Sequence, residues 1–581
     1  MGLHGGHEFT GVANEAVTTI RLPLCCIQAT RLHFPSKDTM ASIRTASAEI
    51  DTTNLLTILG VVAAIWALIS PTSRLQLRFC MTWLDWTIGV SVLLLAHYLV
   101  FAPALVQLGL YYSLGPWRWG LNSSSAVYLL LLVVAFYFLW RTRSPTLVRG
   151  KIQIFRELIE SFLFTKRYVE LVLHVEPQLP KLLRLSKGEP WLVRCIDRIN
   201  VAPADLAALR RGEAPRPQPA WRKYLSKVLK NSRAWCLQLD DTRTQAREIL
   251  QILVTSPELT SYLAVTHPYF CLKLFEADVV TRSDFIEECL DAMLDAPASR
   301  LYVELKSNQN QNGGHRLALP ESNRLLRFFF ADSTAAVDNG LYRAIGEAVF
   351  RRLDEDGKLA AKFNEPLKSY AELGRLRCPI NSGITMFEIM VHEGIHQGLQ
   401  DHMWLHYFQH FAREILKQMS SLPAEQEHLE WPTPFHYLLS RLIRVTTGWA
   451  EQCVHIEDSE ISKGTREEKG FDRCYISKEA TKALGEMLQI IIPSPKISDS
   501  FKRYLLASVI RSHNWLQAKG DFADVANSLR SAVTRGIDWP AECAYRAELL
   551  EHFQGLDHRL RMDAELFEKA LLESTAECQR R

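Results

Sequence analysis

One short stretch of the sequence carries residue types that could do chemistry together. His392-Glu393-Gly394-Ile395-His396 is an H-E-x-x-H pattern. Residues four apart lie on the same face of a helix, so His392 and His396 could bind one Zn²⁺. Glu393 would face the metal-bound water and act as general base. The pattern therefore predicts a zinc-dependent metallopeptidase with Glu393 as its catalytic residue.

This segment resembles the active-site helix of the zincin metallopeptidases. An apolar Ile-Met-Val at 389–391 precedes the first histidine, as in that helix. The segment departs from the usual pattern after the second histidine, where polar Gln397 and flexible Gly398 follow. Zincins that use a glutamate as third metal ligand take it from a later helix. The resemblance implies Glu451, which lies 55 residues after His396, as that ligand.

Three further histidines extend the pattern beyond the motif. At about 100° per residue, His402, His406 and His410 share one face with His392 and His396 if the helix is continuous. Three interpretations remain open for this face. It could bind metal, it could sense pH through histidine protonation, or it could be a packed face whose imidazoles hydrogen-bond to neighbouring elements.

The elements that must position these residues begin with three uncharged hydrophobic stretches, at 52–73, 86–117 and 120–140. A helix needs about 20 mainly apolar residues to cross the hydrocarbon core of a bilayer. Tryptophans at 83, 86, 117, 119 and 140 lie near the ends of these stretches, where aromatic rings favour the membrane interface. We therefore predict three transmembrane helices within 52–140, preceded by a disordered tail at 1–51.

Loop charge predicts the orientation of these helices. Positive residues favour the cytoplasmic side. Arg74 and Arg78 lie between the first two stretches and only Arg118 lies between the last two, whereas several arginines follow the third. The N-terminus is therefore expected outside and the main domain in the cytoplasm.

A basic segment follows the last hydrophobic stretch. Residues 141–235 contain 20 Lys and Arg against 8 Asp and Glu, a net charge of +12, whereas the whole chain has a net charge of +3. Such a segment next to a membrane favours contact with anionic lipid headgroups. Nucleic acid is the less favoured partner, because aromatic residues are not interleaved as in a stacking platform. The proline-rich stretch at 210–221 reads as a linker.

The 12 cysteines are scattered and form no C-x-x-C pair. This argues against a disulfide framework and favours a reducing compartment.

The rest of the chain, 236–581, shows the i, i+3, i+4 apolar spacing of helices. We expect a mostly α-helical cytoplasmic domain, in which pairs of helices could stack as an irregular solenoid. One β-hairpin is expected at 300–319, where alternating apolar residues flank Asn312-Gly313. Nucleotide-binding and nucleophile-elbow motifs are absent from the sequence. The predicted function is a membrane-anchored interaction or effector protein, able to act with protein partners or as an oligomer, and the alternative is the zinc metallopeptidase.

Overall fold

The computed structural model describes residues 79–101, 123–143, 147–187, 241–277, 282–309 and 317–580, together with a few isolated residues before 123. Within the last range it leaves out 318, 356, 368–373, 422–430, 458 and 468. The described part of the chain is mostly helical and contains no strand. The predicted mostly α-helical class is therefore confirmed.

The chain divides into two compact units. The first contains 1–69 and 84–139, and the second contains 70–83 and 140–581.

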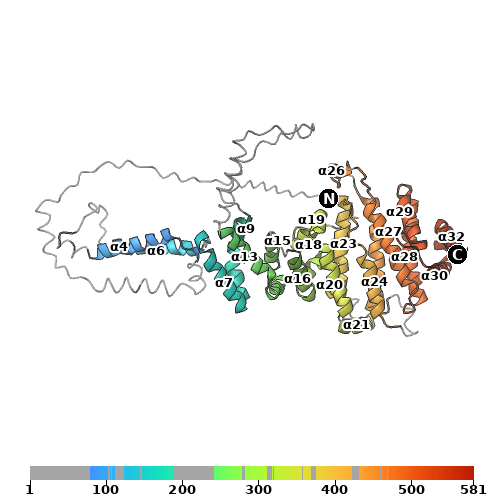
Figure 1. Ribbon diagram of the computed structural model, residues 1–581, viewed down its shortest axis with the longest axis horizontal. Coiled ribbons are helices and arrows are strands. Elements are labelled where there is room, and N and C mark those ends of the chain that lie inside the picture. Colours follow the sequence, from blue (N-terminus) through green and yellow to red (C-terminus); the bar gives the residue numbers. More distant parts are fainter. Residues whose placement is uncertain are drawn as a thin grey trace, which may run out of the picture. The chain divides into compact units, whose positions relative to one another are not determined.

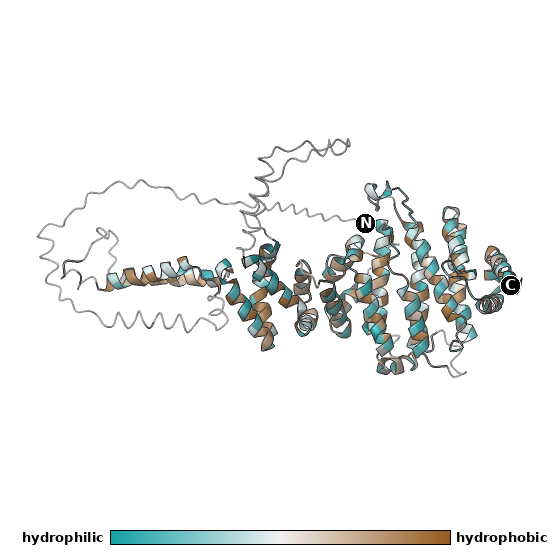
Figure 2. Cartoon of the chain, viewed as in Figure 1, coloured by the Kyte–Doolittle hydropathy of each residue, from teal (hydrophilic) through white to brown (hydrophobic). Residues whose placement is uncertain are grey.

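The first unit is built around two apolar helices, α4 (Trp83–Val100) and α6 (Ser123–Arg143). They pack through a buried apolar cluster of Ala96, Leu99 and Val127. Asp85, the buried carboxylate of α4, accepts a hydrogen bond from the hydroxyl of Tyr137 on α6. The two helices are largely brown in the hydropathy view (Figure 2).

Most large apolar side chains of these two helices face outward rather than into a core. On α4 they include Trp86, Val90, Leu93 and Leu94, and on α6 Tyr128, Val133, Phe136 and Leu139. Among the described residues, α4 is the one helix that is long and apolar enough to cross a membrane, with a mean hydropathy of 1.5 over 18 residues. The apolar part of α6, Ala126–Arg141, is shorter.

The prediction of three transmembrane helices is thus not confirmed. The second predicted span contains most of α4, and the third coincides with most of α6. The first predicted span and the tail at 1–51 lie, apart from Gly60, outside the described residues.

The second unit is a succession of helices. Its first part contains α7 (Ile152–Phe164), α8 (Tyr168–Val175), α9 (Leu179–Lys187), α13 (Asp241–Thr255), α14 (Pro257–Thr266), α15 (Pro268–Phe275), α16 (Arg282–Asp295), α17 (Arg300–Gln309) and α18 (Arg324–Phe330). Its second part contains α19 (Ser333–Asp338), α20 (Leu341–Glu355), α21 (Gly357–Phe363), α23 (Pro379–Gln397), α24 (Tyr407–Gln418), α25 (Pro434–Gln452), α26 (Lys463–Arg466), α27 (Tyr475–Ile491), α28 (Asp499–Ala518), α29 (Ala523–Thr534), α30 (Cys543–Gln554), α31 (His558–Met562) and α32 (Glu565–Arg580). Short 3₁₀ turns lie at Arg149–Lys151, Glu176–Gln178, Gly374–Arg377, Cys453–His455 and Gly520–Phe522.

Each helix of this unit packs mainly on helices that are near it in the sequence. The chain of contacts runs from α9 and α7 to α13, then through α14, α16, α20, α23, α25, α27 and α29 to α32. Figure 1 shows these helices following one another along the unit. Such quasi-one-dimensional stacking buries one continuous apolar core between successive layers. The irregular solenoid considered from the sequence describes this unit well.

Local sequence signals set many helix starts. Proline occupies the first turn of α14, α15, α23 and α25, where its missing N–H costs no hydrogen bond. The hydroxyl of Ser498 accepts from the backbone N–H of Phe501 and caps α28. Asp332 caps α19 in the same way, by accepting from Ala335.

The predicted β-hairpin at 300–319 is wrong in its first half, which forms the helix α17. The alternation of Leu301, Val303 and Leu305 reads as a strand, but Val303 is half exposed while Tyr302 is buried with the two leucines. Buried positions 301, 302 and 305 follow helical spacing. The buried carboxylate of Glu304 then accepts from two N–H groups at the start of α18. The predicted turn at Asn312-Gly313 lies outside the described residues.

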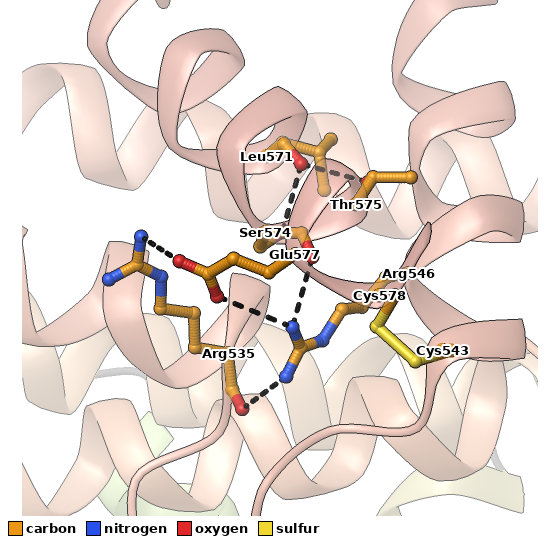
Figure 3. Close-up of a disulfide and its surroundings, with 8 residues drawn as sticks. All are labelled: Arg535, Cys543, Arg546, Leu571, Ser574, Thr575, Glu577 and Cys578. Carbon is orange, nitrogen blue, oxygen red and sulfur yellow. Dashed lines mark hydrogen bonds and ion pairs between the residues drawn. A yellow bond between two sulfur atoms is a disulfide. The ribbon is translucent and has the colours of Figure 1, made fainter. Parts of the chain in front are cut away.

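The scattered spacing of the cysteines also did not predict the one disulfide of the described residues. Cys543 and Cys578 form a disulfide with Cα atoms 5.6 Å apart, which joins α30 to α32 (Figure 3). Beside it, Arg546 donates to the carbonyl of Ser574 at 3.0 Å, and Glu577 lies 3.3 Å from the guanidinium of Arg535. Helices α30 and α32 are therefore linked by a covalent bond as well as by packing. Six other described cysteines are free thiols.

Candidate functional site

The H-E-x-x-H motif lies on α23, one of the most buried helices of the second unit. The helix begins after Cys378 with a proline in its first turn and ends at Gly398, which has a left-handed φ of 70°. All three motif side chains are buried, with His396 only 1% exposed. The helix packs against both α20 and α25. The motif is therefore enclosed rather than displayed in an open cleft.

The two histidines lie next to each other, as the sequence predicted. The ring centroids of His392 and His396 are 4.6 Å apart. The backbone N–H of Leu317 donates to Nε2 of His392 at 2.9 Å. Nδ1 of His396 hydrogen-bonds to the carboxylate of Glu460, and Nε2 lies 2.9 Å from the side-chain amide nitrogen of Gln452. These contacts fit a neutral His396 that donates through Nδ1 and accepts through Nε2.

Glu393 takes part in a second set of hydrogen bonds. Its carboxylate accepts from the amide nitrogen of Gln397 at 3.2 Å. That same amide nitrogen donates to the carbonyl of Ala331 at 3.0 Å. The amide oxygen of Gln397 accepts from both the N–H and the hydroxyl of Ser333, at 3.0 and 2.8 Å. Gln397, which departs from the zincin pattern, thus connects Glu393 to the start of α19.

Glu451 does not lie with the motif side chains. It lines a hollow between α25 and α28, together with residues such as Thr447 and Ser512. Burial raises the pKa of its carboxyl, and contact with the Ser512 hydroxyl partly offsets this. Its neighbour Gln452 is the α25 residue that reaches His396. In the described part of the chain, no group of three or more His, Cys, Asp or Glu side chains is arranged to hold a metal ion.

Comparison with protein-family models, with curated proteins and with solved structures found no match.

The expected five-histidine face does not form, because the helix is not continuous. It stops at Gly398, and the next helix, α24, starts at Tyr407. A glycine that readily adopts positive φ is a common helix terminator, so the local signal was present in the sequence. The second group of histidines, His402, His406 and His410, lies on the connecting turn and on α24. The two groups belong to different environments.

The connecting turn has an unusual backbone. Met403 and Trp404 have φ values of 45° and 51°, a region that side-chain-bearing residues seldom adopt. Met403 is fully buried, and its N–H donates to the carboxylate of Asp401 at 2.7 Å. The N–H of Trp404 donates to Nδ1 of His402 at 3.0 Å. The turn thus buries Met403 and leaves the indole of Trp404 44% exposed, stacked on Tyr342.

His406 lies between two surface hollows. One, of about 290 Å³, is also lined by Glu347, Phe350, Trp404, Tyr407 and His410, and the other, of about 600 Å³, by residues of α24, α27 and the 537–542 turn. Hydrogen bonding to Glu486 raises the pKa of His406, whereas burial lowers that of His410. The pKa values of these two neighbouring imidazoles are therefore shifted in opposite directions.

The arrangement at the motif connects elements rather than exposing reactive groups. Glu393, His392 and His396 tie α23 to the segment at 317, to α19, to the end of α25 and to Glu460 through buried hydrogen bonds. Sequence reasoning missed Gln452 and Glu460, since neither belongs to a motif. No local pattern could have identified them.

Proposed function

We propose that this chain is a membrane-anchored helical interaction protein, with α4 and α6 in the bilayer and the helical succession from α7 to α32 as the part that binds partners. Support for the anchor comes from the outward-facing apolar side chains of α4 and α6. Exposed apolar patches of this extent are unfavourable in water, and on helices they favour a lipid environment. The buried pairing of Asp85 with Tyr137 satisfies a polar group at the end of α4.

The finer topology belongs to this proposal. Three spans within 52–140 place the N-terminus outside and the second unit in the cytoplasm, following the arginine asymmetry of the loops. The basic segment at 141–235 then faces the anionic inner leaflet and contacts lipid headgroups. A reporter fused after Arg149 is expected to be active in the cytoplasm, and one inserted at 121–124 outside.

Support for the interaction role comes from the second unit. Successive helix layers, each packed on its sequence neighbours, create extended surfaces of the kind that solenoid proteins use for binding. The buried hydrogen bonds around the H-E-x-x-H motif stabilise this stacking at its centre. In this proposal the motif residues have a structural role in the helix stacking and no catalytic role.

Alkaline extraction of membranes tests the anchor. The full chain is expected to stay in the pellet. A double change of Leu93 and Leu94 to Arg should increase the fraction of the chain that alkali releases, because charges at the centre of a span cost about 2.5–3.5 kcal/mol each. Leu566→Arg is the matched control, since Leu566 is an exposed leucine on α32 of the second unit. Release of the wild-type chain by alkali would refute the anchor.

A further inference from the structure

Two helices of the second unit, α25 and α28, face each other across a polar groove. They run in the same direction, because His436 packs on Phe501 near their starts and His455 packs on Trp515 near their ends, with ring centroids 5.0 and 5.7 Å apart. Each contributes four residues to the groove, at spacing i, i+3, i+4 and i+7, which is one face of a helix. They are Arg444, Thr447, Gly448 and Glu451 from α25, and Ser508, Arg511, Ser512 and Trp515 from α28.

The groove exists because small residues stand where larger ones would fill it. Its volume is about 500 Å³. Gly448 lies on its α25 side, and a Cβ at this position would meet no atom within 4 Å. Ser508 and Ser512 lie opposite, one turn apart on α28. At these small residues, α25 and α28 therefore leave a space between them.

Both arginines of the groove are available to a ligand. Arg444 and Arg511 are exposed, and neither makes an ion pair with another described residue. Some other arginines of the unit are engaged: Arg352, for example, pairs with Asp291 and Asp295. A third cation, Lys519, lies 5.8 Å from the ring of Trp515 at the end of the groove.

Hydroxyl groups complete the donor set. The Ser512 oxygen is buried and makes no hydrogen bond of regular geometry within the described part, although it lies beside the Glu451 carboxyl. The Ser508 hydroxyl likewise makes no hydrogen bond to another described residue. Thr447 differs, since its hydroxyl already donates to carbonyls of its own helix. A buried hydroxyl without a regular partner can be satisfied by a ligand or by water.

We propose that this groove binds the phosphate group of a phosphorylated small molecule, held by Arg444 and Arg511 from opposite helices and by the hydroxyls of Ser508 and Ser512. Guanidinium groups bind phosphate oxygens through paired charge-assisted hydrogen bonds. Serine hydroxyls donate to the remaining oxygens. Glu451 also lines the groove and limits the charge that it tolerates, because an ionised carboxylate there repels the phosphate.

This site does not depend on the membrane anchor and goes beyond the proposed function. The phosphate could belong to a soluble metabolite or to a lipid headgroup, and both present the same chemistry. Glycerol 3-phosphate and phosphatidic acid share a phosphate monoester and therefore separate these two sources.

The test uses the full chain in detergent micelles at fixed ionic strength, with calorimetric titration of glycerol 3-phosphate and with glycerol as the neutral control. Arg444→Gln and Arg511→Gln are each expected to weaken binding about tenfold, the loss of one charge-assisted contact. Glu451→Gln should bind as tightly as wild type or more tightly. Arg327→Gln is the matched control, because Arg327 is an exposed arginine on α18, outside the groove, and it should change affinity less than twofold.

A second titration, with phosphatidic acid in mixed micelles, identifies the source. Arginine-dependent binding of both probes assigns a soluble phosphate ester, and arginine-dependent binding of phosphatidic acid alone assigns a lipid headgroup. Absence of binding by both probes would overturn the proposal, as would an equal loss in Arg327→Gln. Unchanged thermal unfolding of the variants shows that they remain folded. Alkaline extraction measures the anchor separately, so the two proposals can fail independently.

Discussion

The side-chain amide nitrogen of Gln452 lies 2.9 Å from Nε2 of His396, while the preceding residue, Glu451, lines the groove between α25 and α28. Adjacent residues on a helix point about 100° apart. That rotation puts an amide where a zinc enzyme of this type would need a carboxylate. It also leaves Glu451 for a different environment, in which burial raises its pKa.

His396 is expected to act as a stabilising residue. His396→Ala would leave Glu460 and Gln452 without their shared partner and create a cavity, at a cost of about 2–4 kcal/mol in the free energy of unfolding. Chemical denaturation of wild type and variant measures this. Metal analysis of the same two proteins tests the zinc hypothesis, and we expect no stoichiometric zinc in either. One zinc per wild-type chain, lost in His396→Ala, would restore the metallopeptidase.

Acid is expected to destabilise the second unit through His436. Burial lowers the pKa of this histidine to about 4, and Nδ1 is hydrogen-bonded to the Thr433 hydroxyl at 2.8 Å. Because the folded pKa lies below the unfolded value of about 6.5, the unfolded chain binds more protons between these two pH values, and stability falls as pH falls through that window. The full effect is about 3 kcal/mol, reached near pH 4.

His436→Gln should remove much of this loss when denaturation midpoints at pH 7 and pH 5 are compared. His558→Gln, at an exposed histidine, is the control and should behave like wild type. Burial also lowers the pKa of His174 and His513, so part of the acid sensitivity remains in the variant. An unchanged pH dependence in His436→Gln would show that this side chain is not the source.

At position 404, a glycine variant is expected to be more stable than an alanine variant. A residue with a side chain in the left-handed region costs about 1–2 kcal/mol, which glycine does not incur. Trp404→Gly is therefore expected to be about 1 kcal/mol more stable than Trp404→Ala, since both lose the stacking on Tyr342 equally. At Arg413, in the middle of α24, the order should reverse by about 1 kcal/mol. Thermal unfolding of the four variants gives both differences. The same order at both positions would argue that the turn is not strained.

The pair Cys543 and Cys578 reports both stability and location. The disulfide closes a loop with a sequence separation of 35 residues, and Cys543→Ser should lower the stability of the last helices by about 3 kcal/mol. Cytoplasmic thiols are kept reduced. If the second unit is cytoplasmic, both cysteines should react with a thiol-blocking reagent added to intact cells, and the bond should form after purification in air. A pair already oxidised in cells would put this unit on the oxidising side and reverse the proposed orientation.

The sequence by itself determined the helical class, the apolar character of 86–100 and 126–140, and local signals such as the cap at Ser498. These features depend on the spacing and type of neighbouring residues, which local physics converts into helices and their ends. The break at Gly398 was also visible as a departure from the zincin pattern. The hairpin prediction was wrong because the apolar residues of 300–309 fit both the alternating pattern of a strand and the spacing of a helix. Only burial against α18 and α23 decides between the two.

Tertiary structure alone decided which side chains meet. Gln452 and Glu460 reach His396 from 56 and 64 residues away, and Arg444 faces the same groove as Arg511 because α25 and α28 run side by side in one direction. The rotation of a helix about its axis selects which of two adjacent residues makes a contact. That rotation is set by packing over the whole helix face, and no short motif contains it. The H-E-x-x-H spacing therefore predicted two neighbouring imidazoles and left their partners to the fold.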